Sequence, residues 1–150
     1  MISPPHGLAG IMDVFGDPAD PEFEARNIVS FDLPYPLVYD GKRIFRSRCH
    51  RLAVDNFIQV FMDLDHAGLA SEVSNYGGIY AQRSIRGRAT RPSTHSWGIA
   101  IDVEPAKYPL RSLARLPQPV IEVFKRAGFT YGGDFKGRKD PMHFQLCSGY

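Results

Sequence analysis

Apolar positions recur with two different periods along this chain, and each period predicts a different kind of element. In residues 51–67 large apolar side chains return every three or four positions, the repeat of a helix with one buried face, and Gly68 follows as a stop signal. Residues 116–127 show the same repeat, with prolines near the start and Gly128 after the end. We therefore expect two amphipathic helices.

Shorter segments between and after these helices have the alternating or apolar pattern of strands. Residues 1–45 contain six prolines, so we expect irregular wrapping chain there, with short strands such as 37–39. Grouped helices beside short strands joined by loops indicate an α+β fold with a mostly antiparallel sheet. The other expected strands are 78–82, 98–104, 129–131 and 142–146.

Composition narrows the class of protein. A chain of 150 residues with 43% hydrophobic and 23% charged residues is expected to form one folded domain, residues 1–150. The net charge of +2 does not call for a nucleic-acid partner, and we expect none. No stretch approaches 18 apolar residues, so we expect no membrane insertion. Cys49 and Cys147 lack metal-site spacing, and we expect free buried thiols.

Two of the expected strands each place a possible metal ligand in an apolar setting. Asp102 lies among isoleucines and a valine, His143 lies between Met142 and Phe144, and His95 precedes the first of these strands. Seven extended residues span roughly 23 to 25 Å, whereas ligands of one zinc ion lie within about 4 Å of each other. His95 and Asp102 can therefore meet only across a sharp bend at residues 96–98.

Spacing alone leaves a metal site and ordinary structural residues both open. A histidine on a strand can simply be hydrogen-bonded in the core, and an aspartate can pair with an arginine. If a metal is bound, three protein ligands leave one position open, which is the catalytic pattern. Asp140, three residues before His143, could then move protons, although before Pro141 it could equally be a turn residue.

The segments STHSWGIAIDVEP and GGDFKGRKDPMHFQL closely resemble the zinc peptidoglycan peptidases of the D-alanyl-D-alanine carboxypeptidase and L-alanyl-D-glutamate endopeptidase family, which includes VanY-type enzymes and many phage endolysins. The pattern Ser-x-His-x-x-Gly-x-Ala-x-Asp runs from Ser93 to Asp102, and an acidic residue stands three positions before the second histidine. The resemblance extends over about residues 75–146. It implies a small α+β domain shared with the Hedgehog signalling domain.

The resemblance also implies roles for individual residues. His95, Asp102 and His143 would hold Zn²⁺, and Asp140 would be the general base.

Three further residues would contact the substrate or support the site. Arg83 would steady the scissile carbonyl or a substrate carboxylate. Arg86 is the competing candidate, because the family pattern defines the position of this arginine less tightly. Ser93 would contact the substrate or support His95.

The function implied is hydrolysis of a peptide bond in the peptidoglycan stem peptide, as an L-alanyl-D-glutamate endopeptidase or a D-Ala-D-Ala carboxypeptidase. We expect no separate cell-wall-binding domain. The start of the chain does not resemble a signal peptide, so we expect a phage or prophage endolysin, a monomer made in the cytoplasm that reaches the cell wall after holin release or on a virion. The alternative is a non-catalytic, zinc-stabilised binding module, which the Hedgehog relationship allows. A nucleic-acid binder would rest only on the arginines of residues 83–91, a charge run more typical of solvated surface.

Overall fold

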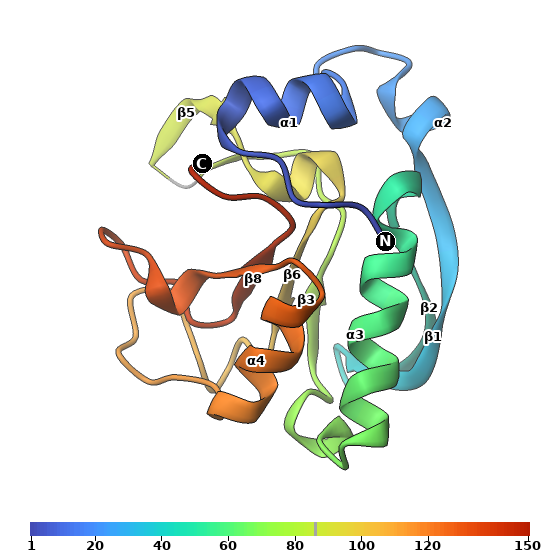
Figure 1. The fold of residues 1–150 in the computed structure, drawn as a ribbon, viewed down its shortest axis with the longest axis vertical. Coiled ribbons are helices and arrows are strands. Elements are labelled where there is room, and N and C mark those ends of the chain that lie inside the picture. Colours follow the sequence, from blue (N-terminus) through green and yellow to red (C-terminus); the bar gives the residue numbers. More distant parts are fainter. Residues whose placement is uncertain (86) are drawn as a thin grey trace.

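A four-stranded antiparallel sheet in the order β3-β6-β8-β7 forms the middle of the computed structural model, which describes residues 1–85 and 87–150 (Figure 1). Register pairs Asp102 with His143 and Ile101 with Phe144 across the two central strands. Because side chains alternate along a strand, the two polar residues share one face and the two apolar residues share the other. The strands are β3 (Tyr76–Gly78), β6 (Ala100–Val103), β7 (Thr130–Tyr131) and β8 (His143–Gln145).

Helices pack against the apolar side of this sheet. In α4 (Gln118–Arg126), Phe124 stacks on Phe144 of β8 with ring centroids 3.8 Å apart. α3 (Val54–His66) contacts both α4 and the long N-terminal strand β1 (Ile28–Tyr39) (Figure 1). Both expected helices are confirmed, apart from a 3-10 turn over the first three residues of the range 51–67. With Phe144 facing the helices, His143 and Asp102 face the opposite side.

The N-terminal third is more regular than the prolines suggested, so the expectation of an irregular segment over residues 1–45 is wrong. Pro34 and Pro36 lie in β1, where the ladder shifts register, so their missing N–H groups break no regular pairing. The other four prolines precede α1 or separate it from α2. The segment contains α1 (Gly7–Phe15), α2 (Phe23–Asn27) and the hairpin of β1 (Ile28–Tyr39) with β2 (Lys42–His50).

The expected strand at 78–82 is also wrong, because β3 ends where that strand was to begin. Gly78 turns the chain with a φ of 117°. Side chains then take both backbone hydrogen bonds of Ile79. Its N–H donates to the Tyr76 hydroxyl at 2.8 Å, and its carbonyl is hydrogen-bonded to the His95 imidazole. The chain continues into a small two-stranded ribbon formed by β4 (Ser84–Ile85) and β5 (Arg88–Pro92).

The fold class is α+β, as expected, with antiparallel strand pairing in its sheets. Throughout residues 1–85 and 87–150, no helix has the length and apolarity needed to cross a membrane. Cys49 and Cys147 are free and buried, as the sequence predicted. Burial raises the pKa of each thiol to about 12, so both remain protonated near neutral pH.

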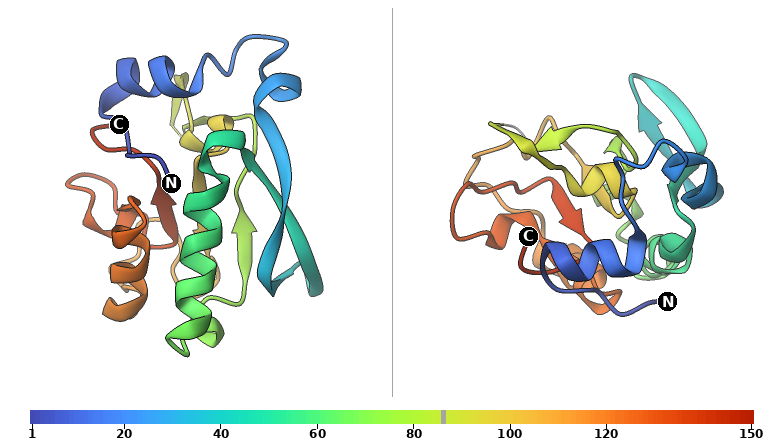
Figure 2. Two further views of the ribbon diagram at one scale, coloured as in Figure 1. Left: turned by 45° about the vertical axis from the view of Figure 1, so that its right-hand side comes forward. Right: turned by 90° about the horizontal axis from the view of Figure 1, so that it is seen from above.

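The two ends of the chain meet beside the central sheet. α1 lies across one end of the molecule, close to the C-terminal residues in each view (Figures 1 and 2). His6, just before α1, forms an isolated parallel bridge with Ser148. The N-terminal segment therefore packs against the chain that follows β8.

Candidate metal centre

A tight turn brings His95 back over β6. Residues Thr94–Trp97 form a 3-10 turn that Ser93 caps, its Oγ accepting from the His95 N–H at 3.3 Å. Gly98 ends the turn in the left-handed region with a φ of 68°. A Cβ at this glycine would lie 2.8 Å from the backbone nitrogen of His50, so both conformation and space require glycine. The bend predicted at residues 96–98 is therefore confirmed.

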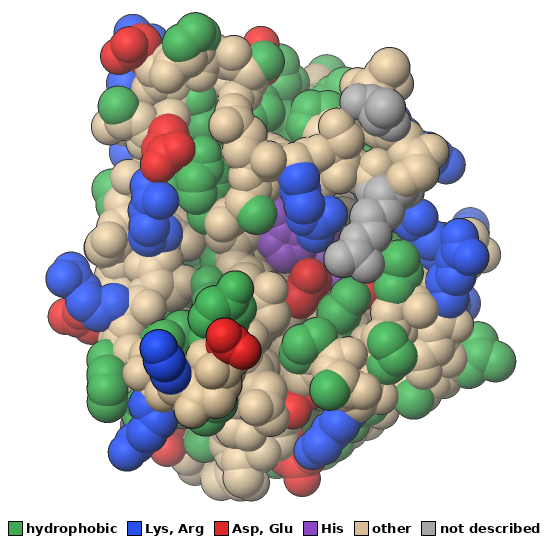
Figure 3. Space-filling model, turned by 180° about the vertical axis from the view of Figure 1, so that it is seen from behind, with side chains coloured by type: hydrophobic (Ala, Val, Ile, Leu, Met, Phe, Trp, Pro, Cys, Tyr) green, Lys and Arg blue, Asp and Glu red, His purple; other side chains and the backbone are tan. Residues whose placement is uncertain are grey.

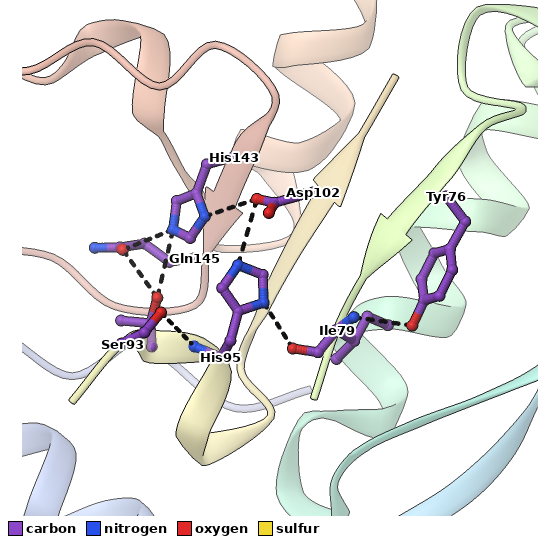
Figure 4. Close-up of polar contacts among 8 residues, drawn as sticks. Tyr76, Ile79, Ser93, His95, Asp102, His143 and Gln145 are labelled. Carbon is purple, nitrogen blue, oxygen red and sulfur yellow. Dashed lines mark hydrogen bonds and ion pairs between the residues drawn. The ribbon is translucent and has the colours of Figure 1, made fainter. Parts of the chain in front are cut away.

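Two imidazoles converge on one oxygen of Asp102, so three ligand-type side chains meet (Figure 4). His95 Nε2 lies 3.3 Å from Asp102 Oδ1, and His143 Nδ1 lies 3.0 Å from the same oxygen. All three residues are buried, and one ligand atom from each falls within 4.8 Å of the others. Ligands about 2.0–2.1 Å from a tetrahedral zinc ion would be roughly 3.3 Å apart. The cluster thus has nearly the dimensions of a zinc site.

The second nitrogen of each imidazole is held by a partner that orients the ring. His95 Nδ1 lies 2.7 Å from the Ile79 carbonyl oxygen and donates to it, which directs the Nε2 lone pair towards Asp102. His143 Nε2 lies 3.0 Å from Gln145 Oε1, which leaves Nδ1 as the ligand atom. Among the described residues, buried His95 Nε2 has no hydrogen-bond partner. A metal ion would satisfy this nitrogen, so the residues fit a metal.

Charges in the cluster favour a bound cation. Burial alone would raise the pKa of Asp102, but the hydrogen bond with His143 and the electrostatic influence of the nearby His95 outweigh it and hold the pKa well below its usual range. Burial alone would lower the pKa of His143, but the Asp102 carboxylate outweighs it and the pKa is raised. The metal-free site therefore keeps an anionic Asp102 that attracts a proton, and a metal ion would compete for that position.

Glu104, on the same alternating face of this segment as Asp102, has a different environment. Its Oε1 accepts from the backbone N–H groups of Ser74 and Asn75 at 2.8 and 2.9 Å. Its Oε2 accepts from the Asn75 side chain at 2.9 Å. Glu104 therefore anchors the turn before β3, whereas Asp102 meets the two histidines.

Asp140 is held next to the cluster by backbone hydrogen bonds. Its N–H donates to the Gly132 carbonyl at 3.0 Å, and its own carbonyl accepts from the His143 N–H at 3.1 Å. A Cβ at Gly132 would overlap the Asp140 carbonyl, so this approach requires glycine. Within the described chain, Asp140 Oδ1 is a buried oxygen without a hydrogen-bond partner. Burial, with the nearby Asp102 charge, raises the pKa of Asp140.

A cleft of about 690 Å³ opens over the cluster, with Asp102, Asp140 and His143 in its lining. Seen from behind, histidine surface is visible in a hollow with acidic and basic side chains beside it (Figure 3). Arg83 and Ser93 also line the cleft. Ser96 holds the backbone of Arg83, since its Oγ accepts from the Arg83 N–H at 3.0 Å and donates to the Arg83 carbonyl at 2.7 Å. Arg86, the competing candidate, lies outside the described residues.

Sequence reasoning overlooked several cleft residues. Alternation along β8 places Gln145 on the face of His143, but a pattern on one strand does not show that the amide meets the imidazole. Arg88 and Arg91 were interpreted as solvated surface, yet both line the cleft with Tyr150. Only the folded chain brings these segments together.

Comparison with known proteins finds one family model that matches part of the chain. Residues 86–146 match the family model described as D-alanyl-D-alanine carboxypeptidase. This range includes the three clustered ligand residues and Asp140. A search of curated proteins found no match. The family match supports a peptidase that acts on peptidoglycan.

Proposed function

Because the family match confirms the resemblance to the D-alanyl-D-alanine carboxypeptidases, we propose that the chain is a zinc-dependent peptidase that hydrolyses a peptide bond in the peptidoglycan stem peptide. His95, Asp102 and His143 hold Zn²⁺ in this proposal. The observation that carries it is the meeting of both imidazoles on one Asp102 oxygen, with His95 Nε2 oriented but lacking a hydrogen-bond partner among the described residues.

The residues around the cluster divide the remaining work. Zinc with three protein ligands supplies Lewis-acid activation of a water molecule and of the substrate carbonyl. Asp140 accepts the proton from the attacking water and delivers it to the leaving amine. The raised pKa of Asp140 lies nearer to neutral pH than that of an ordinary aspartate, which makes its carboxylate a stronger base for this transfer.

Arg83 and Ser93 support the same reaction from the cleft wall. Arg83 steadies the scissile carbonyl or a substrate carboxylate, and its backbone hydrogen bonds with Ser96 support a fixed position. Arg86 remains the competing candidate for this role. The hydrogen bond from the His95 backbone N–H to the Ser93 hydroxyl supports the proposal that Ser93 holds His95 in place, in addition to contacting the substrate.

Zinc dependence is tested with purified peptidoglycan. The protein should release new amino termini, lose activity in a chelator and recover it with added zinc. Mass measurement of the fragments identifies the bond cut, either D-Ala-D-Ala, L-Ala-D-Glu or a cross-bridge. Activity that persists in a chelator with no metal bound would refute the zinc mechanism.

Asp140 separates the peptidase from a non-catalytic, zinc-stabilised binding module. Asp140→Asn has nearly the same shape but no basic carboxylate, so a peptidase should lose turnover while keeping its zinc. A binding module should retain peptidoglycan binding unchanged and show no turnover in either form. The half-buried Asp63 on α3 offers a control, because it lies outside the cleft and its oxygen accepts from the Gln59 side chain, a bond that asparagine can keep. Asp63→Asn should therefore leave turnover intact.

The finer biological role is a phage or prophage endolysin that acts on the cell wall after holin release or virion delivery. Its support is the resemblance of the sequence to a family that includes many phage endolysins. Expression with and without a holin in a bacterial host would test it, since lysis should require both the holin and an intact Asp140.

A further inference from the structure

Gly149 and Tyr150 line the cleft, and the N-terminal segment holds the chain just before them. The Gly7 N–H donates to the Ser148 carbonyl at 2.8 Å, and the Ser148 N–H donates to the Pro5 carbonyl at 3.0 Å. Gly149 has a φ of 67° and passes so close to His6 that a side chain there would overlap the imidazole. The two ends of the chain therefore set the position of the next residue, Tyr150.

Tyr150 forms a rigid part of the cleft wall. Its hydroxyl donates to the Pro92 carbonyl at 2.6 Å. Its ring stands edge-on to Trp97, with centroids 5.8 Å apart. Trp97 is itself fully buried and donates from Nε1 to the Gly16 carbonyl at 2.8 Å. A ring with these contacts has little freedom to turn.

Arg91 lies on this ring. Its guanidinium carbon is 4.5 Å from the Tyr150 ring centroid, and both side chains line the cleft. No ion pair joins Arg91 to an acidic side chain within residues 1–85 and 87–150. Stacking on an aromatic face fixes the plane of a guanidinium and leaves its N–H donors at the edge for a ligand.

We propose that Arg91 is a specificity-determining residue that binds a carboxylate of the substrate peptide, and that Tyr150 positions it. This inference rests on the proposed peptidase function. A planar guanidinium matches the two oxygens of a carboxylate with paired hydrogen bonds, which an uncharged carboxamide cannot reproduce. Arg91 thereby adds a second cationic contact to that of Arg83 and makes the enzyme sensitive to amidation of the stem peptide.

The test compares two defined stem peptides, one with free carboxylates and one with carboxamides in their place. The wild-type protein should show a lower KM for the free acid. Arg91→Gln should raise that KM about tenfold or more, the usual effect of losing hydrogen bonds to a charged group. KM for the amidated peptide and kcat for both should change little. Arg91→Lys, which keeps the charge without the fork, should fall between.

Arg88→Gln is the matched control, because Arg88 also belongs to β5 and lines the same cleft. If Arg91 makes an oriented contact with the substrate carboxylate, Arg88→Gln should change KM much less than Arg91→Gln does. Equal increases that vanish at high salt would instead indicate general attraction by the basic rim and would overturn the proposal.

Tyr150 is tested with two variants. Tyr150→Phe keeps the ring and should keep most of the preference for the free acid. Tyr150→Leu removes the stacking surface and should raise KM as Arg91→Gln does, with no additional loss in the double variant. Full additivity of the two losses would refute the positioning role.

Failure of this inference and failure of the proposed function look different. If the zinc-loaded wild-type protein cleaves neither peptide nor peptidoglycan, the peptidase function is wrong. If it cleaves both peptides with the same KM and Arg91→Gln changes neither, the peptidase stands and the role of Arg91 is wrong.

Discussion

Gly98 links the metal cluster to the N-terminal hairpin, so Gly98→Ala should damage both stability and metal binding. A left-handed conformation costs a non-glycine residue about 1–2 kcal/mol. The new Cβ would also lie 2.8 Å from His50 N and 3.0 Å from Ile28 Cδ1. Overpacking of this kind typically costs about 1–3 kcal/mol more. We therefore expect the free energy of unfolding to fall by about 2–5 kcal/mol.

Gly68→Ala is the matched control for this measurement. Gly68 has a φ of 70°, close to the 68° of Gly98, but nothing lies within 4 Å of its would-be Cβ. Gly68→Ala should therefore lose only the conformational part, about 1–2 kcal/mol. The difference between the two variants in denaturant titrations of the metal-free protein isolates the steric part.

The same substitution should weaken zinc binding, because movement of Gly98 displaces the turn that carries His95. The Gly98 N–H donates to the His95 carbonyl at 3.0 Å, so the two residues shift together. Competition with a coloured chelator would measure the zinc affinity. The reasoning is refuted if Gly98→Ala is no more destabilising than Gly68→Ala and retains the wild-type zinc affinity.

Three further predictions concern the metal and the titrating groups. Elemental analysis should find no bound zinc in His95→Ala or His143→Ala, and unchanged metal content would exclude these ligands. Both variants should also lose the stability that bound zinc contributes, which is about 2.7 kcal/mol when free zinc is one hundred times its Kd. Because the pKa of Asp140 is raised, activity should decline on the acid side at a pH above the ordinary aspartate value of about 3.9, and a pH–rate profile that stays flat down to that value would contradict its role as base. In the metal-free protein, the raised pKa of His143 contributes stability that is complete below its unfolded pKa of about 6.5 and is lost as pH rises through the higher folded pKa. The lowered pKa of Asp102 contributes stability that is lost as pH falls below about 3.9. Denaturant titrations should show the loss at high pH in the wild type and not in His143→Gln.

Local signals in the sequence predicted the two main helices well. For residues 51–67 and 116–127, the apolar repeat lies within the element and the terminating glycine follows it directly. The N-terminal third was mispredicted because its regularity comes from pairing β1 with β2, and the prolines that suggested irregular chain fall at a register shift or between elements. The strand expected at 78–82 was wrong because side chains from elsewhere take the hydrogen bonds of Ile79.

The sequence by itself determined the chemical inventory of the site: two imidazoles, a carboxylate in an apolar strand, and a glycine that permits the bend between them. Only the tertiary structure decided how these groups are used. The Ile79 carbonyl turns His95, Gln145 turns His143, and Tyr150 holds Arg91 at the cleft. Periodicity and turn residues act over a few positions, whereas the contacts of His95 with Ile79 and of Arg91 with Tyr150 join segments far apart in the sequence. They depend on how the whole core packs, which no local pattern records.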